Sequence, residues 1–357
     1  MFSISKESSD TINILKCILA IGVVMIHIRL SVIEIDGENI LLNGQFDSFN
    51  TFYRLIMIFL RVCVPVYFMI SGFLFFMKAP EKPNISFFKE SYKKRIRSLL
   101  IPYLIGNIIA IFLFVIGEKF IPNIMGGGHQ NISDYSFPDI LMSFWRMPGN
   151  MDPINQVLWF LRDLMVMILL SPVFYWLIKK TDYWCLILFF LNYIFEGTRD
   201  IPGFRPVAIF FFSFGAFFSI KGEDIFTNMK KYVWYLLAAY ILLFFIASIT
   251  ELNYIKNLSV VAGVPVVTII VYYLVKRCSW TFDTKWIAAT FFLYIYHNFP
   301  VTVVKKLLIM LIHPTSSLDC LIIYFVTGII VVVVMLVLYF LLKKLMPRTM
   351  ALVVGGK

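Results

Sequence analysis

The sequence predicts an all-α membrane protein, built as a polytopic bundle of about ten transmembrane helices. Hydrophobic residues make up 60% of the 357-residue chain, and charged residues only 15%. Soluble proteins carry about 25% charged residues, so this chain has too few polar groups to cover a soluble fold of its size. Apolar runs of roughly 17–25 residues, the length that crosses a bilayer, recur along the chain. We therefore expect one integral-membrane domain over residues 1–357.

Ten apolar runs are candidate spans, and polar or charged segments separate them. The fifth run is the shortest, and the ninth has an indistinct end near Val304. The spans lie near residues 12–30, 55–77, 98–116, 157–178, 182–195, 203–220, 231–249, 259–276, 286–304 and 318–342.

Basic residues gather in alternate loops, which is the pattern that orients membrane proteins with positive loops in the cytoplasm. If the N-terminus is cytoplasmic, the inner segments hold 20 of the 32 Lys and Arg residues and the outer segments hold 8. The net charge of +11 follows from this distribution and does not indicate a nucleic-acid-binding surface. We predict that both termini are cytoplasmic.

The first span carries two ionisable residues on one face. Lys16 and His27 are eleven residues apart, which is about 20° past three helical turns and about 16 Å along the axis. An ionisable residue at membrane depth is costly and normally faces protein or a water-filled cavity. We therefore expect this helix to form one wall of an intramembrane cavity.

Three other spans carry polar residues in the middle or outer half of the membrane: Arg61, Arg162 with Asp163, and His297 with Asn298. Arg61 and Asp163 could instead form a structural ion pair between helices. His297 could equally make a structural interhelical hydrogen bond. Arg162 and Asp163 are adjacent and do not face each other on a helix, so each is expected to pair with a different partner.

A histidine at this depth suits acyl transfer in two ways. A neutral imidazole can act as general base for a hydroxyl nucleophile, or it can attack a thioester and carry the acyl group itself. Arg or Asn at the same depth can stabilise the oxyanion of the tetrahedral intermediate.

Two loops are longer than a simple connection requires. The outer segment 117–156 contains Gly126 to Gly128 and an amphipathic piece from Phe137 to Trp145, which predicts either a lid over the cavity or a loop with one interfacial helix. The inner segment 78–97 ends in Tyr92-Lys93-Lys94-Arg95-Ile96-Arg97. Such cations bind phosphates, either those of anionic lipids or those of a cofactor such as coenzyme A.

The cysteines indicate neither a metal site nor a disulfide framework. All five sit in or beside apolar runs, without a CxxC pair or a histidine at ligand spacing. We expect them to be buried small hydrophobic residues and expect no metal.

Five motifs together resemble the acyltransferase 3 family of bacterial integral-membrane O-acyltransferases. They occur in the family's order from about residue 12 to Lys344, with Lys16 where Arg is commoner. The motifs are Leu15-Lys16 through Met25-Ile26-His27, Arg61 through Ser71-Gly72-Phe73, Lys94-Arg95-Ile96-Arg97 with Ile101-Pro102-Tyr103, Trp159-Phe160-Leu161-Arg162-Asp163-Leu164, and Tyr294-Ile295-Tyr296-His297.

The resemblance implies transfer of an acyl group, usually acetyl, from cytosolic acetyl-CoA or another acyl-CoA to a hydroxyl of a cell-surface or lipid-linked glycan. It implies a multi-pass protein of the bacterial inner membrane, in contact with the lipid bilayer and able to form a homo-oligomer. The implied site has His27, Arg162 and Asp163 as catalytic residues, Lys16, Lys94, Arg95, Arg97 and Ser71 as cofactor-binding residues, and Arg61, Trp159, His297 and Asn298 as substrate-binding residues.

Two other function classes are compatible with charges inside the membrane. A transporter or flippase of a glycan precursor would use them to line a transit path, although the sequence shows no clear repeated halves or broken helices of the kind that many transporters have. A membrane sensor is the third class, but no second domain for signalling is apparent in the sequence.

Overall fold

The computed structural model describes residues 4–35, 38–121, 131–280, 283 and 285–356, and most of them form helices. The predicted all-α class is confirmed. Within the described residues, extended structure is confined to the antiparallel pair β1 (Glu34–Ile35) and β2 (Glu38–Asn39). The triplet from Gly126 to Gly128, which contributed to the predicted lid, lies outside the described residues.

The elements of the first part of the chain are α1 (Lys6–His27), the 3-10 helices η1 (Ile40–Leu42) and η2 (Gly44–Phe46), α2 (Asp47–Leu60), α3 (Cys63–Met77), α4 (Ile85–Arg95), the π-helical η3 (Ile96–Leu100), α5 (Ile101–Phe120), η4 (Ile132–Asp134), α7 (Phe137–Ser143) and η5 (Gln156–Leu158). Those of the second part are α8 (Trp159–Leu169), α9 (Ser171–Thr181), α10 (Trp184–Ile194), α11 (Pro206–Lys221), α12 (Ile225–Lys230), α13 (Val233–Ile249), α14 (Asn253–Cys278), α15 (Lys285–Tyr296), α16 (Asn298–Ile312), α17 (Ser317–Leu345) and α18 (Pro347–Val353).

Several of these segments are long and apolar enough to cross a membrane. By length and composition, five segments of the described chain qualify, and two bent helix pairs, α8 with α9 and α15 with α16, raise the number to seven. The helices α10, α11 and α13 are apolar but shorter. Each of the ten predicted runs overlaps one of these segments. Three of the segments are shorter than the length used to count spans, so the total of ten spans stays a prediction.

Several spans that the sequence presents as continuous are interrupted. The interruptions lie at Arg61–Val62 between α2 and α3, in η3 before α5, at Leu170 between α8 and α9 with a bend of 60°, and at His297 between α15 and α16 with a bend of 66°. Pro65, Pro102, Pro172 and Pro300 follow these points. A proline has no N–H to donate to the carbonyl four residues earlier, and its ring clashes with that carbonyl. The absence of a clear broken helix in the sequence is therefore corrected for residues 157–178 and 286–304, while their assignment as spans stays a prediction.

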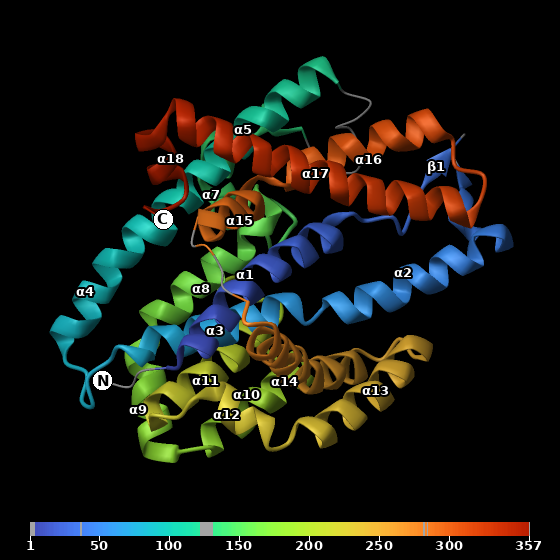
Figure 1. Ribbon diagram of the computed structural model, residues 1–357. Coiled ribbons are helices and arrows are strands. Elements are labelled where there is room, and N and C mark those ends of the chain that lie inside the picture. Colours follow the sequence, from blue (N-terminus) through green and yellow to red (C-terminus); the bar gives the residue numbers. More distant parts are fainter. Residues whose placement is uncertain (1–3, 36–37, 122–130, 281–282, 284, 357) are drawn as a thin grey trace.

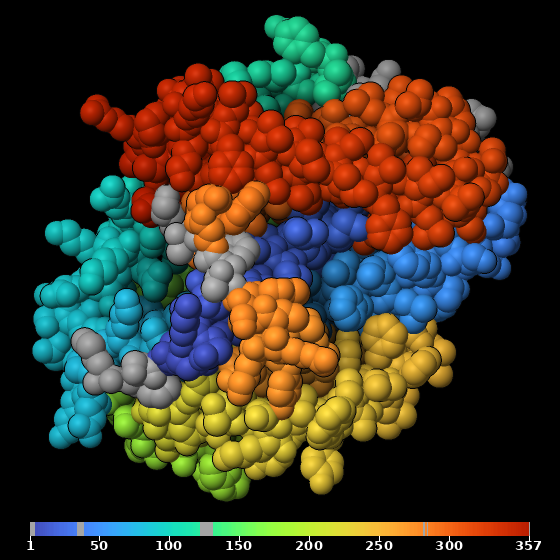
Figure 2. Space-filling model, in the orientation of Figure 1, coloured from blue at the N-terminus to red at the C-terminus, as the bar shows by residue number. Residues whose placement is uncertain are grey.

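The helix α1 runs through the middle of the molecule, between α17 on one side and α14 on the other (Figure 1), and it also contacts α3 and α15. It ends at His27, so residues 28–30 of the predicted first span lie beyond the helix. The space-filling view shows part of α1 in dark blue between the red α17 and the orange α14 (Figure 2). The last residue of this central helix is thus the predicted catalytic residue.

The helices α3 and α11 pack with their backbones in contact. A Cβ added to Gly72 would lie 2.0 Å from the carbonyl oxygen of Phe212, and one added to Gly215 would lie 1.9 Å from that of Met69. Only glycine permits so close an approach, which is a common way to pack helices in membranes. This contact fixes the position of Ser71, the neighbour of Gly72.

Both termini lie at the same end of the molecule, where α4 is also found (Figure 1). The segment after α17 folds back onto the start of α5: α18 contacts α5, and Gly355 lies so close to Ser98 that an added Cβ would be 2.6 Å from its carbonyl oxygen. The placement of both termini on the cytoplasmic side of the membrane stays a prediction.

Candidate active site

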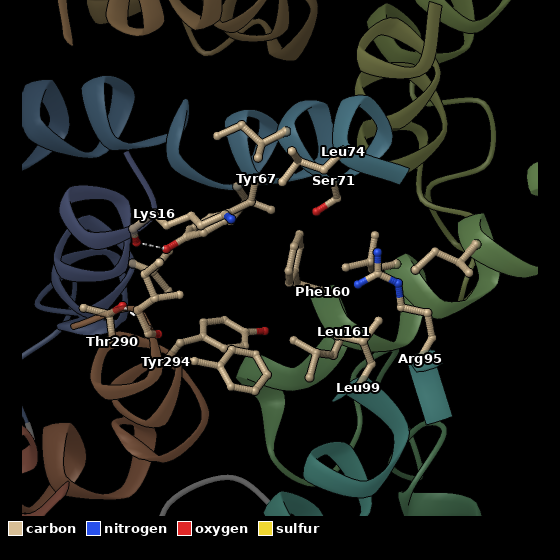
Figure 3. Close-up of a pocket in the computed structure, with 17 residues that line it drawn as sticks. Lys16, Tyr67, Ser71, Leu74, Arg95, Leu99, Phe160, Leu161, Thr290 and Tyr294 are labelled. Atoms are coloured by element: carbon tan, nitrogen blue, oxygen red, sulfur yellow. Dashed lines mark hydrogen bonds between the residues drawn. The ribbon is translucent and has the colours of Figure 1, made fainter. Parts of the chain in front are cut away.

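An inner cavity of about 200 Å³ lies between α1, α3, α8 and α15. Its polar lining includes Lys16, Tyr67, Ser71, Arg95 and Thr290, and most other lining residues are aliphatic or aromatic. Figure 3 shows Lys16 and Arg95 on opposite sides, with Ser71 on a third wall. The Tyr67 hydroxyl donates a hydrogen bond to the backbone carbonyl of Lys16 and so holds α3 against α1.

The charge of the inner cavity is entirely positive. None of the described residues that line it is Asp or Glu, and neither Lys16 nor Arg95 has a carboxylate within ion-pair distance in the described part of the chain. Two unneutralised cations on a mostly apolar wall suit a ligand that is partly anionic and partly apolar.

An outer cavity of about 510 Å³ lies farther along α1. Its lining includes Ile26, Trp159 and Val64, and Val64 also lines the inner cavity. Its charged and amide lining residues are Arg61, Glu196, Arg199, Asp200, Arg205 and Asn257. The two cavities are therefore neighbours that share part of a wall.

His27 itself lines neither cavity, but its neighbours along α1 do. Val23, one turn before it, lines the inner cavity, and Ile26, directly before it, lines the outer one. The Nδ1 of His27 is 2.7 Å from the carbonyl oxygen of Val23. Because a carbonyl can only accept, Nδ1 carries the proton, and Nε2 is left as the nitrogen that can accept one.

His297 lies beside His27, at the bend between α15 and α16. The two ring centroids are 5.0 Å apart, with an angle of 67° between the planes. The Nδ1 of His297 lies 2.9 Å from the carbonyl oxygen of Tyr294 and 3.1 Å from that of Leu293, while Nε2 is buried without a hydrogen-bond partner. Two imidazoles from distant parts of the chain thus meet, each with Nδ1 held by backbone.

Arg162 and Asp163 pair with each other, and the prediction that each has a different partner is wrong. The Arg162 Nη2 lies 2.8 Å from Asp163 Oδ1, and both side chains are fully buried. The long arginine side chain folds back along α8, a geometry that residue spacing alone does not indicate. Arg162 also donates to the carbonyls of Trp145 and Met151, and the Gly203 N–H donates to Asp163.

The Arg162–Asp163 pair therefore fastens two loops to the start of α8. Neither residue lines the inner or the outer cavity. The alternative ion pair between Arg61 and Asp163 is also wrong, because Arg61 hydrogen-bonds to Asn257 instead, at 3.2 Å.

The remaining predicted site residues divide between the cavities and the surface. Ser71 lines the inner cavity as expected, and Trp159 lines the outer one. Lys94 and Arg97 are exposed and line neither cavity, so of the basic motif only Arg95 reaches the inner cavity. Asn298 lines a separate small cavity of about 20 Å³.

Cys278 departs from the expectation for the cysteines, because it is exposed while the other four are buried. It lies at the last residue of α14, beyond the apolar part of that helix. The sequence places it next to Lys276 and Arg277, which is the signal that could have identified it as a surface residue.

Arg205 and Asn257 are the site residues that the sequence analysis missed. Arg205 stacks on Trp159, with its guanidinium carbon 4.3 Å from the ring centroid, and forms an ion pair with Asp152. Its position directly before Pro206, at the start of an apolar run, could have suggested a functional cation. Asn257 is an ordinary polar residue in a helix, and no sequence signal distinguishes it.

A family model described as an acyltransferase domain matches residues 10–342. No significant match was found among curated proteins or among solved structures.

Proposed function

The chain belongs to the acyltransferase 3 family, and on that premise we propose that this membrane acyltransferase moves an acyl group, most simply acetyl, from cytosolic acyl-CoA to a hydroxyl of a cell-surface or lipid-linked glycan. The proposed setting is the inner membrane of a bacterium. The observation that supports the proposal best is the position of His27, at the end of α1, beside His297 and next to Val23 and Ile26, which line the inner and the outer cavity.

The inner cavity supplies the donor side. Arg95 stands at the end of α4, where it would attract a phosphate of the donor, and Lys16 would face the polar pantetheine arm. The aliphatic and aromatic walls accommodate the acyl chain. No acidic residue lines this cavity within the described chain, so nothing there repels a polyanionic cofactor.

The outer cavity supplies the acceptor side. Trp159 and its stacked partner Arg205 form an aromatic and cationic wall, a surface that suits the apolar face and the hydroxyls of a sugar. Because Val64 belongs to both cavities, a displacement of this side chain would connect the donor side with the acceptor side.

The reaction follows from the tautomer of His27. The Nε2 accepts the proton of the acceptor hydroxyl while the oxygen attacks the thioester carbonyl carbon, which forms the C–O bond. The C–S bond then breaks, and the imidazolium returns the proton to the departing CoA sulfur. The hydrogen bond from Nδ1 to Val23 orients the ring throughout, as the carboxylate does in a catalytic triad.

Replacement of the base tests the proposal. We expect His27→Ala to reduce acyl transfer by about 10²–10⁴-fold, the usual contribution of a general base, while acyl-CoA binding and the melting temperature are retained. The measurement is the rate of radiolabelled acetyl transfer to glycan by purified protein. His313→Ala is the matched control, because His313 is exposed at the end of α16. Full activity of His27→Ala would rule out this mechanism.

A second candidate has one observation in its favour. The helix pairs α8–α9 and α15–α16 are bent by 60° and 66°, and transporters often bind their substrates at such discontinuous helices. A glycan transporter or flippase would move its substrate into liposomes without acyl-CoA. An acyltransferase would instead consume acyl-CoA and modify the glycan, so the same liposomes with and without acyl-CoA distinguish the two.

A further inference from the structure

Arg61 differs from the other arginines of the outer cavity in its partner. Arg199 forms an ion pair with Glu196 at 2.7 Å, and Arg205 forms one with Asp152. Arg61 donates only to the side-chain oxygen of Asn257, at 3.2 Å, and has no carboxylate within ion-pair distance among the described residues. Among the described residues Arg61 therefore makes no direct ion pair, although Glu196 and Asp200 line the same cavity.

The orientation of Asn257 is fixed by its surroundings. Its Nδ2 donates to the carbonyl oxygens of Tyr193, at 3.1 Å, and Ile194, at 3.4 Å, and to Glu196 Oε1, at 3.4 Å. The residue is only 2% exposed. The amide oxygen must then point toward Arg61. A neutral acceptor thus aligns the guanidinium without neutralising it, which is the arrangement that a preorganised anion receptor needs.

The fold also fixes the place of Arg61. It follows the last residue of α2, at the interruption before α3, and Pro65 lines the same cavity one turn later. Of the cavity's acidic residues, Glu196 is already paired and Asp200 is exposed. Among the described residues that line the cavity, Arg61 is therefore the arginine without an ion pair, and it is available to bind an anion that enters.

We propose that Arg61 binds an anionic group of the acceptor, so that the enzyme acts on anionic rather than uncharged acceptors. The group is a carboxylate of an acidic sugar or a phosphate of a lipid carrier, and both suit the planar fork of arginine. The proposal rests on the proposed acyl transfer to a glycan. It adds the charge of the acceptor, and it assigns Arg61 the recognition of that charge.

The test compares two matched acceptors in the presence of acetyl-CoA: a hexuronate-containing oligosaccharide, and the same oligosaccharide with its carboxyl groups reduced to alcohols. Inorganic pyrophosphate serves as a competitor that represents the phosphate of a lipid carrier. For a carboxylate site, the wild-type kcat/KM is expected to be about 10–100-fold higher for the acidic acceptor, the range of one charged hydrogen-bonded contact. For a phosphate site, pyrophosphate is expected to inhibit the reaction while the two acceptors react alike.

Arg61→Gln removes the charge but keeps a donor for Asn257. For a carboxylate site, this variant should lose the preference for the acidic acceptor, mainly through a change in KM. For a phosphate site, it should lose the inhibition by pyrophosphate. Arg61→Lys keeps the charge and should retain part of either effect, even if the glutamine variant does not fold. Arg54→Gln is the matched control, because Arg54 is exposed on the same helix and lines neither cavity. Equal kcat/KM for both acceptors, together with no inhibition by pyrophosphate that depends on Arg61, would overturn the proposal.

Direct binding separates this proposal from the proposed function. Calorimetry without acetyl-CoA should show that the acidic oligosaccharide or pyrophosphate binds the wild type and Arg54→Gln but not Arg61→Gln. Arg61-dependent binding without acyl transfer would refute the acyltransferase function and leave the anion site intact. Acyl transfer to both acceptors at equal rates, without inhibition by pyrophosphate that depends on Arg61, would refute the anion site and leave the acyltransferase function intact.

Discussion

His297 has two different nitrogens, and this difference suggests its role. Its Nδ1 lies within hydrogen-bond distance of two backbone carbonyls, whereas its Nε2 is buried without a partner, beside His27. A buried acceptor without a partner is costly and is usually retained for function. The sequence suggested an acceptor-binding role for His297, and the geometry favours a role in positioning the imidazole of His27.

We expect His297→Phe to lower kcat about tenfold and to leave the KM for acyl-CoA unchanged. The phenyl ring preserves the edge-to-face contact with His27 but removes the free nitrogen, so packing is retained while the polar environment of the base is lost. Initial rates across a range of acyl-CoA concentrations measure both quantities. If His297 were only a packing residue, kcat would not change, and the melting temperature would show that the variant folds.

At the scale of secondary structure, the breaks in the helices place the functional residues. Arg61 lies at the break before α3, Arg95 at the start of the π-helical segment, and His297 at the bend after α15. Pro65, Pro102 and Pro300 follow them. These prolines are visible in the sequence, so the breaks could have been predicted from them. The direction of each bend could not, because neighbouring helices determine it.

The contact between α3 and α11 predicts a large effect from one methyl group. We expect Gly72→Ala to lower the melting temperature and the yield of folded protein, because the added Cβ would lie 2.0 Å from the Phe212 carbonyl oxygen, which cannot move away as a flexible side chain can. Thermal melting in detergent, followed by size-exclusion chromatography, measures both.

Gly44→Ala is the control for this prediction. A Cβ at Gly44 would lie no closer than 3.7 Å to its nearest neighbour, a side-chain oxygen of Asp47, so we expect the melting temperature of this variant to be unchanged. Equal melting temperatures for the Gly72 and Gly44 variants would show that α3 and α11 do not pack as described.

For the whole molecule, the charge distribution and the fold predict one orientation in the membrane. The inner cavity holds Lys16 from the middle of α1, and Arg95 from the end of α4, which lies at the end of the molecule that also contains both termini. The outer cavity lies nearer the other end. A donor from the cytoplasm and an acceptor from outside would therefore approach His27 from opposite sides.

Cysteine labelling tests this orientation. Cys278 is exposed at the end of α14, whereas Glu251, whose side chain is 83% exposed, precedes the start of the same helix. A membrane-impermeant maleimide should label the wild type in inside-out vesicles but not in intact cells. The Cys278→Ser, Glu251→Cys variant should show the opposite pattern. Labelling of Cys278 in intact cells would reverse the predicted orientation.

The sequence by itself determined the fold class and the family, and it supplied the candidate site residues. Low charge and long apolar runs required a helical membrane protein, because a backbone in lipid must satisfy its own hydrogen bonds. The eleven-residue spacing of Lys16 and His27 placed them on one face of α1, because helical geometry is local.

Only the tertiary structure decided which residues meet. It brought His297 to His27 across 270 residues of chain, joined Arg162 to its own neighbour Asp163, and gave Arg61 the neutral partner Asn257. The position of a residue along its span sets its depth in the membrane. The rotation of each helix about its axis, and the helices that it contacts, depend instead on packing between helices. That packing involves contacts distant in sequence, such as Gly72 with Phe212, which residue spacing along one helix does not encode.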